Sequence, residues 1–405
     1  MLILEWVTVV VAAGILAIWI SRCATIYSRR ARGPILGRDT IPDAPPSGRI
    51  SIILPAKDEE TNIRGALETI QAQDYADIEI IVVDDRSRDR TPEIVREMAA
   101  ADPRIRLVQV AELPPGWFGK PHAMHVGAGE ARGEWLLFVD ADCRQAPHSA
   151  RAGVNFLTDR RGDMLSLWPV LEMHGFCENA FQPVAGSVLV AWFRPGWVND
   201  PRRRTAFANG QYILIRRKTY EAVGGYAAVR NEIVEDIALA RLVKRSGHAL
   251  WNATGADLFT TRMYDSLRAM YKGWTRIYYG AFKSVAWLAG VILLTFLFTL
   301  APFAALAVSA VAMAAGDVAP FTLAMFGLSA AMTLVLFITM RRYFIAGRAN
   351  PWYLFFYPLG VVLTMVFQFG AILRALGLRS VTWRGTTYKG GRVVSGGGKQ
   401  RGGTP

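Results

Sequence analysis

The sequence is poor in the residues that build disulfide frameworks and metal clusters. Its 405 residues include three cysteines and five histidines. Cys23, Cys143 and Cys177 lack the spacing of a metal or redox motif, and three cysteines cannot all pair. His122 and His125 have no metal-ligating residues in company, so we interpret both as structural. The few cysteines exclude a fully paired framework and fit a reducing compartment.

Charged residues are also scarce, at 20% of the chain against 52% apolar residues. This balance is typical of a soluble domain joined to membrane segments. The net charge of +13 would suit nucleic acid, but no nucleic-acid-binding motif accompanies it. We therefore expect no nucleic acid partner, and we expect membrane lipids with anionic headgroups and diphosphate ligands instead.

The first apolar block, Leu2 to Ile20, has the length of a membrane-spanning helix. It lacks the basic start, the shorter apolar core and the small-residue cleavage site of a signal peptide, so residues 1–30 are predicted to be an N-terminal transmembrane anchor. Basic residues follow the block, namely Arg22, Arg29, Arg30 and Arg32. By the positive-inside rule they predict that the N-terminus faces out and that the middle of the chain lies in the cytoplasm. Together with the apolar blocks near the C-terminus, this predicts a multi-pass protein of the cytoplasmic (inner) membrane.

Three more apolar blocks lie near the C-terminus, at Val285–Val311, Pro320–Met340 and Trp352–Leu373. Three crossings would leave the basic tail outside, against the positive-inside rule. We therefore expect two to three transmembrane helices within residues 284–375, with Pro358 and Gly360 breaking the last block into a re-entrant hairpin. Residues 376–405 are predicted to form a basic tail that is partly disordered.

Between these blocks, a linker at residues 31–48 leads into alternating strand and helix patterns. The predicted strands are Arg49–Leu54, Ile78–Val83, Ile105–Val110 and Trp135–Val139, and the predicted helices are Glu60–Gln73, Thr91–Ala101 and Lys120–Ala131. This alternation indicates right-handed crossovers and a mostly parallel α/β sheet. We assign it to a cytoplasmic domain at residues 49–283, with an interfacial or buried helix at residues 180–193.

Acidic side chains follow three of these strands. They are Asp58 and Glu59 after the first, Asp84 and Asp85 after the second, and Asp140 and Asp142 after the fourth. Ligands of such sheets bind at the carboxyl ends of the strands. Asp140 and Asp142 would both reach one Mg²⁺ or Mn²⁺, which takes one or two carboxylates plus diphosphate oxygens. Solvated turns and helix caps are the structural alternatives.

Another acidic pair, Glu235 and Asp236, begins a predicted helix in "VEDIALARLVKRSG". Complementarity to the helix dipole explains acidic residues at such a place. The functional alternative is that Asp236 is a general base that removes a proton from an acceptor hydroxyl.

The chain resembles the family 2 glycosyltransferases of the GT-A (Rossmann-like) fold from about residue 49 to 280. The resemblance rests on six short segments in this order: "PAKDEE", "VDDRS", "GK", "VDADC", "ANG" and "VED". The segments "LPPGWFGKPHAMHVG", "RMYDSLRAMYKGW" and "VTWRGTTY" are similar to the membrane-anchored branch associated with hopanoid and carotenoid biosynthesis. The resemblance implies an inverting, metal-dependent hexosyltransferase that uses Mg²⁺ or Mn²⁺. It would move one sugar from a nucleotide-sugar donor to a lipid acceptor.

The resemblance also implies roles for single residues. Asp236 would be the catalytic base, and Asp140 and Asp142 would bind the metal. The residues expected to bind the donor are Pro55, Glu59, Asp84, Asp85, Lys120 and Asp140. The residues expected on the acceptor side are Asn209, Gly210, Glu235, Trp274 and Arg276.

The chain departs from processive relatives, which carry a Gln-x-x-Arg-Trp signature where this sequence has "YKGWTRIYYG". The difference favours a single transfer over polymer synthesis, although Trp274 and Arg276 also suit an anchor at a membrane interface. Two other functions stay open. A haloacid-dehalogenase-type phosphatase usually has its aspartates after the first strand, not the fourth. A transporter with a cytoplasmic nucleotide-binding domain usually has ionisable residues inside its spans, and these blocks have none.

Overall fold

The structure is a computed structural model that describes residues 2–28, 33–38 and 48–379, and the backbone of residues 381–383, 386–389 and 392–395. The chain divides into two compact units. The helical unit comprises Met1–Arg32, Met173–Trp192 and Tyr264–Ala375, and the sheet unit comprises Gly33–Glu172, Phe193–Met263 and Leu376–Pro405. Each unit is described by itself.

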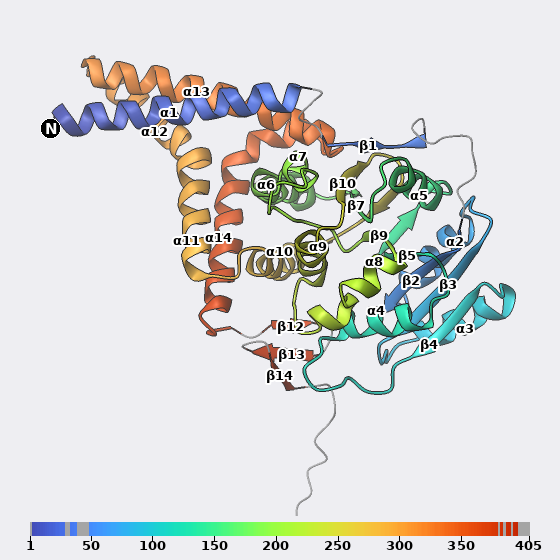
Figure 1. Cartoon of the computed structure of the whole chain (residues 1–405). Helices are drawn as coiled ribbons and strands as arrows, with labels where there is room; N and C mark the ends of the chain where they lie inside the picture. Colours follow the sequence, from blue (N-terminus) through green and yellow to red (C-terminus); the bar gives the residue numbers. More distant parts are fainter. Residues whose placement is uncertain are drawn as a thin grey trace, which may run out of the picture. The chain divides into compact units, whose positions relative to one another are not determined.

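The sheet unit is built on an eight-stranded, mostly parallel sheet (Figure 1). The strands lie in the order β1 (Ile35–Leu36), β10 (Leu250–Gly255), β7 (Met164–Trp168), β9 (Tyr212–Arg216), β5 (Trp135–Val139), β2 (Ile50–Ala56), β3 (Ile78–Asp84) and β4 (Ile105–Gln109). Strand β9 runs antiparallel to both of its neighbours, β5 and β7, and the other neighbouring strands are parallel. The predicted α/β fold class with a mostly parallel sheet is confirmed. The predicted linker contributes the edge strand β1, and residues 39–47 of that linker lie outside the described residues.

The centre of the sheet explains why the acidic turns meet. Strand β2 lies between β3 and β5, with Ile53 opposite both Ile81 and Phe138. All three strands are rich in apolar residues and almost wholly buried, as expected for strands covered on both faces of a mostly parallel sheet. Their carboxyl ends share one edge, so the acidic residues that follow them are brought together.

Helices connect and cover these strands (Figure 1). They are α2 (Ile63–Gln71), α3 (Thr91–Ala101), α4 (Gly119–Glu130), α5 (Ser149–Asp159), α7 (Pro195–Val198), α8 (Arg217–Ala222), the 3-10 helix η2 (Gly225–Val229) and α9 (Glu235–Arg245). Helix α2 shows the reason for their packing, since Ile63, Leu67 and Ile70 recur at helical spacing and are buried. Two small sheets complete the unit, one of β6 (Cys143–Gln145), β11 (Phe259–Thr261) and β8 (Val170–Leu171), and one of β12 (Val381–Trp383), β13 (Thr386–Lys389) and β14 (Arg392–Ser395).

The helical unit contains α1 (Leu2–Tyr27), α6 (Phe176–Trp192), α10 (Leu267–Phe282), α11 (Val285–Thr295), the π-helix η3 (Phe296–Leu300), α12 (Ala301–Ala314), α13 (Pro320–Ala346), the 3-10 helix η4 (Pro351–Phe356) and α14 (Tyr357–Ala375). Helix α1 packs along α13 (Figure 1). Four stretches are long and apolar enough to cross a membrane, namely Ile3–Tyr27, Val285–Ala314, Pro320–Ala346 and Pro351–Ala375. Helices α6 and α10 belong to this unit, although the predicted domain at residues 49–283 includes them.

The predicted re-entrant hairpin is wrong, because the last block is helical throughout, first as η4 and then as α14, with no break at Pro358 or Gly360. Pro358 is the second residue of that helix, where a missing backbone N–H removes no internal hydrogen bond. Gly360 serves a close approach to α6, since a Cβ there would lie 2.9 Å from Val184 Cγ2 and 3.0 Å from the Ala180 carbonyl oxygen. Both residues therefore suit a packed helix and do not break it.

The predicted basic tail, residues 376–405, is described in part. Its described backbone includes the three antiparallel strands β12, β13 and β14. Residues 396–405, to which the expectation of disorder mainly applies, lie outside the described residues.

Candidate active site

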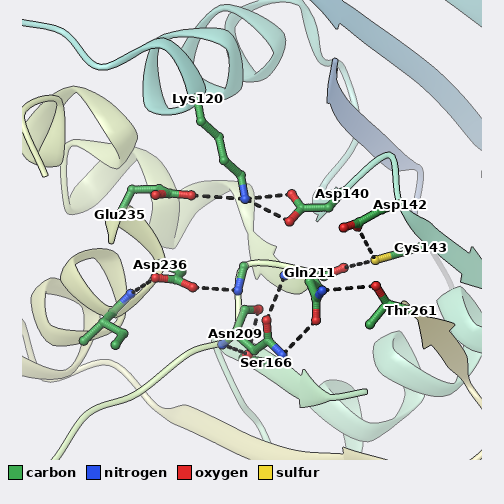
Figure 2. Close-up of polar contacts among 12 residues, drawn as sticks. Lys120, Asp140, Asp142, Cys143, Ser166, Asn209, Gln211, Glu235, Asp236 and Thr261 are labelled. Atoms are coloured by element: carbon green, nitrogen blue, oxygen red, sulfur yellow. Dashed lines mark hydrogen bonds and ion pairs between the residues drawn. The ribbon is translucent and has the colours of Figure 1, made fainter. Parts of the chain in front are cut away.

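The carboxyl edge of the sheet gathers side chains from three elements around one ammonium group (Figure 2). Lys120, on the first turn of α4, points between Asp140, which follows β5, and Glu235, which begins α9. Its Nζ lies 2.7 Å from Asp140 Oδ1, 3.0 Å from Asp140 Oδ2 and 3.2 Å from Glu235 Oε1. Burial alone would lower the pKa of Lys120, but the carboxylates of Asp140 and Glu235 raise it above its usual value. Lys120 is therefore a permanent cation at the centre of this cluster.

Asp236 lies beside this cluster, on the first turn of α9. Its Oδ2 accepts a hydrogen bond from the Gly210 N–H at 2.8 Å, and its Oδ1 accepts one from the Ile237 N–H at 2.7 Å. Burial, reinforced by the charge of Glu235, raises the pKa of Asp236 to about 7. A carboxylate with a pKa near neutrality is a suitable general base at physiological pH.

Asp142 is the second carboxylate with a raised pKa. Burial, together with the charges of Asp140 and Glu59, raises the pKa of Asp142 to about 6. Its Oδ1 accepts a weak hydrogen bond from the Cys143 thiol at 3.5 Å. Burial also raises the pKa of Cys143 well above its usual value, so this thiol stays protonated. The negative charges of Asp140 and Glu59 near Asp142 therefore outweigh the positive charge of Lys120.

The side chains at this edge could supply part of the coordination of a divalent cation, with a bound ligand supplying the rest. Among the described residues, no group of three or more His, Cys, Asp or Glu side chains could hold a metal ion. Mg²⁺ and Mn²⁺ nevertheless bind through one or two carboxylates when phosphate oxygens and waters supply the rest. Asp140 and Asp142 provide two carboxylates, and the raised pKa of Asp142 indicates that nearby positive charge would be favourable.

The expected nucleotide side lies at the end of β3. Asp85 Oδ1 accepts a hydrogen bond from Arg86 Nε at 2.8 Å, and Lys57 Nζ is 3.7 Å from Asp85 Oδ2. Neither Lys57 nor Arg86 was predicted from the sequence, although each lies three residues after the end of a predicted strand, beside acidic residues that were predicted. Asp84 accepts hydrogen bonds from the Ser87 N–H at 3.2 Å and from Gln109 Nε2 at 3.3 Å.

The other donor-side predictions, Pro55 and Glu59, lie at the end of β2 and directly after it. Pro55 is opposite Val83 in the register of β2 and β3. Glu59 is buried, its N–H donates to Thr91 Oγ1 at 2.8 Å, and its Oε2 accepts from Asn62 Nδ2 at 3.0 Å. These contacts hold the "PAKDEE" turn at the shared edge, and its part in donor binding stays a prediction.

We expect Gly119→Ala to weaken binding of a nucleoside diphosphate about tenfold, because a Cβ at this position would lie 2.4 Å from Asp85 Oδ2 and displace that carboxylate. Calorimetric titration with UDP and GDP would measure the effect. The matched control is Gly129→Ala on the same helix, where a Cβ would meet nothing within 4 Å. Equal affinities for the two variants would contradict a binding role for Asp85.

The expected acceptor side includes the turn before β9. The Asn209 N–H donates to Ser166 Oγ at 2.7 Å, and Asn209 Oδ1 accepts from the Gln211 N–H at 3.2 Å. Gln211 Nε2 in turn donates to Thr261 Oγ1 at 3.2 Å. Figure 2 shows Ser166, Gln211 and Thr261 around Asn209. None of the three was predicted, because single polar residues in or beside strands carry no distinctive spacing. They hold the turn that presents the Gly210 N–H to Asp236.

The two remaining predictions, Trp274 and Arg276, lie on α10 in the helical unit. Trp274 is buried there, and its ring centroid lies 5.9 Å from that of Tyr278. Their expected role toward the acceptor stays a prediction.

Comparison with known proteins relates the central part of the chain to glycosyltransferases. Residues 51–237 match the model of the family described as glycosyl transferase family 2. The chain is 25% identical over 254 residues to a 4,4'-diaponeurosporenoate glycosyltransferase of Staphylococcus haemolyticus, a match that covers 62% of this chain and 66% of the relative. It is 33% identical over 94 residues to a GalNAc(5)-diNAcBac-PP-undecaprenol beta-1,3-glucosyltransferase of Campylobacter jejuni, covering 23% of this chain and 29% of the relative. The matched regions therefore span two thirds or less of these relatives.

A solved structure supports the fold. A mannosyltransferase of Pyrobaculum calidifontis, solved in complex with GDP-Man and Mn²⁺, aligns with a TM-score of 0.52 and 21% identity. The alignment covers 86% of this chain and 98% of that chain, which supports the predicted GT-A fold. The segment that matches the model of glycosyl transferase family 2 begins in β2, contains both aspartates after β5 and ends in the first turn of α9, so the match includes the residues of the candidate site.

Proposed function

We propose that the chain is an inverting glycosyltransferase that moves one sugar from a nucleotide-sugar donor to the hydroxyl of a lipid acceptor. The observation that carries this proposal is the position of Asp236. It is a half-buried carboxylate with a pKa of about 7, on the same edge of the sheet as Asp140 and Asp142. Such a transfer needs a general base for the acceptor hydroxyl. It also needs carboxylates that bind the cation of the nucleoside diphosphate.

The proposed reaction is a single in-line displacement. One Asp236 carboxylate oxygen takes the proton of the acceptor hydroxyl through a lone pair that the Gly210 and Ile237 N–H groups leave free. The hydroxyl oxygen then bonds to the anomeric carbon as the bond from that carbon to the diphosphate oxygen breaks. The electron pair leaves with the nucleoside diphosphate, and attack from the opposite side inverts the anomeric configuration.

Asp140 and Asp142 are the residues that would hold Mg²⁺ or Mn²⁺. When bound there, the cation would neutralise negative charge on the departing diphosphate. Asp85 would accept hydrogen bonds from the nucleoside, and the Asn209–Gly210 turn would hold Asp236 toward the acceptor. The mannosyltransferase that shares the fold was solved with both GDP-Man and Mn²⁺, which supports a nucleotide-sugar donor and a divalent cation.

A lipid acceptor is supported by the four stretches that could cross a membrane, and by the names of two relatives that act on a carotenoid acid and on an undecaprenol-linked glycan. Hopanoid, carotenoid or similar lipids are too insoluble to diffuse to a site in water, so an enzyme anchored in the membrane can meet them at its surface. We place the protein in the cytoplasmic membrane, with the sheet unit on the cytoplasmic face.

The proposal is tested by incubating the full chain in detergent with Mn²⁺, a lipid extract and a panel of UDP-, GDP- and dTDP-sugars. We expect one donor to release nucleoside diphosphate in step with the appearance of a glycosylated lipid. Release of diphosphate with no glycosylated lipid would contradict the lipid acceptor. No release from any donor, by a protein that still binds UDP or GDP in a calorimeter, would contradict the transferase.

A further inference from the structure

Lys120 joins the two halves of the site. It is carried by α4, yet its ammonium contacts both Asp140 at the end of β5 and Glu235 on the first turn of α9 (Figure 2). We propose that Lys120 is a positioning residue, which holds the base-bearing end of α9 in place relative to Asp140 through its ion pair with Glu235. This inference rests on the proposed function, because it assumes that Asp236 is the base.

The burial of Glu235 strengthens the electrostatic attraction between Glu235 and Lys120. The Glu235 side chain is 8% exposed and the Lys120 side chain is 18% exposed, so water screens their attraction weakly. Removing one partner of a buried pair leaves the other charge without compensation, which is strongly destabilising locally. Without Lys120, Glu235 would be expected to move toward water, and the adjacent Asp236 would move with the first turn of the helix.

The close packing at Gly210 leaves little room for the first turn of α9 to move. A Cβ on Gly210 would lie 3.1 Å from Asp236 Oδ2 and 3.3 Å from Lys120 Nζ. The base and the ammonium are therefore packed around the same glycine, whose N–H also donates to Asp236. A small shift of α9 would break that hydrogen bond and misdirect the base.

The competing role for Lys120 is direct binding of the donor diphosphate, as the family resemblance implies. The two roles differ in what Glu235 does. A lysine that acts on the diphosphate does not need Glu235, whereas a positioning lysine acts through it. The variants Lys120→Met and Glu235→Gln and their double variant separate the roles, because residues that act as one unit have non-additive effects.

We expect each single variant to lower kcat by about 100-fold, and the double variant to be no slower than the slower single one. Affinity for UDP or GDP with Mn²⁺, measured by calorimetry, is expected to stay within about threefold of the wild type. Lys120→Arg is expected to restore part of the lost kcat, since its guanidinium can still pair with Glu235.

A readout without turnover completes the test. We expect hydrogen exchange of the backbone amides at residues 236–238 to become faster in Lys120→Met and Glu235→Gln, with other segments unchanged. The control is the exposed ion pair between Arg64 and Glu97, which joins α2 to α3. Arg64→Met and Glu97→Gln remove charges of the same types outside the site, and should leave exchange at α9 and kcat unchanged.

Two results would overturn the inference. One is a loss of diphosphate affinity in Lys120→Met as large as its loss of kcat, with Glu235→Gln behaving like the wild type. The other is unchanged exchange at α9 in both variants. A failure of the proposed function is distinguishable, because it would abolish transfer by the wild type while leaving the exchange and binding experiments interpretable.

Discussion

Asp236→Asn is expected to lower turnover by about 1,000-fold, while affinity for UDP or GDP with Mn²⁺ changes by less than about threefold. The amide cannot take a proton from the acceptor hydroxyl, so the chemical step loses its base. Donor binding should survive because Asp236 lies on α9, whereas the residues expected to bind the nucleotide follow β2 and β3. Single-turnover transfer and calorimetric titration would measure the two effects separately.

The pH dependence of turnover by the wild type is a second test of Asp236 as the general base. Because burial raises the pKa of Asp236 to about 7, the base is protonated below that pH and ionised above it. Turnover should therefore rise with pH through about 7 and level off above it. The control is Asp159→Asn, an exposed carboxylate at the end of α5, which should keep both the rate and the profile of the wild type. Full activity of Asp236→Asn would show that another group is the base.

Asp142→Ala is expected to abolish the dependence of UDP or GDP binding on Mn²⁺ and to lower turnover by at least about 100-fold. Asp140 also pairs with Lys120, so loss of Asp142 would leave the proposed cation site with one carboxylate whose charge the lysine already neutralises. Titration of the nucleotide with and without Mn²⁺ would measure the change. Asp159→Ala is the matched control, and its binding should keep the full response to Mn²⁺.

The stability of Asp142→Ala provides an independent check. The raised pKa of Asp142 means that its ionised form is disfavoured in the folded protein, so removing the carboxylate should raise Tm in metal-free buffer at pH 8. The gain should shrink as the pH falls through about 6 toward the ordinary aspartate range, where Asp142 is protonated in any case. In the presence of Mn²⁺ with UDP or GDP, the Tm of the wild type should exceed that of Asp142→Ala, because only the wild type would bind the cation well. A Tm below that of the wild type in metal-free buffer at pH 8 would indicate that Asp142 mainly supports the fold.

Much of the sheet unit could be predicted from the chain because its determinants are local. The predicted helix at Thr91–Ala101 and the predicted strand at Trp135–Val139 have the same bounds in the structure. Alternating strands and helices imply a parallel sheet, and the shared carboxyl edge of its strands follows from that. Asp84, Asp85, Asp140 and Asp142 could therefore be assigned to one edge from the sequence, whereas the role of Asp236 came from the family resemblance.

Other features depend on neighbours that are distant in the chain. The antiparallel insertion of β9 between β5 and β7 is set by pairing between segments about 50 to 80 residues apart, which no local pattern encodes. The continuity of α14 was predicted wrongly, since Pro358 and Gly360 look like helix breakers until the start of the helix and its approach to α6 are known.

The family resemblance, the α/β alternation and the acidic residues at the strand ends can all be recognised in the amino-acid sequence, because they depend on residue order and spacing. The position of Lys120 between Asp140 and Glu235, and the hydrogen bond from the Gly210 N–H to Asp236, are visible only in the folded chain. Ion pairs and hydrogen bonds form only at separations of about 3 Å. Such separations between residues 20 to 115 positions apart are set by the packing of the whole unit.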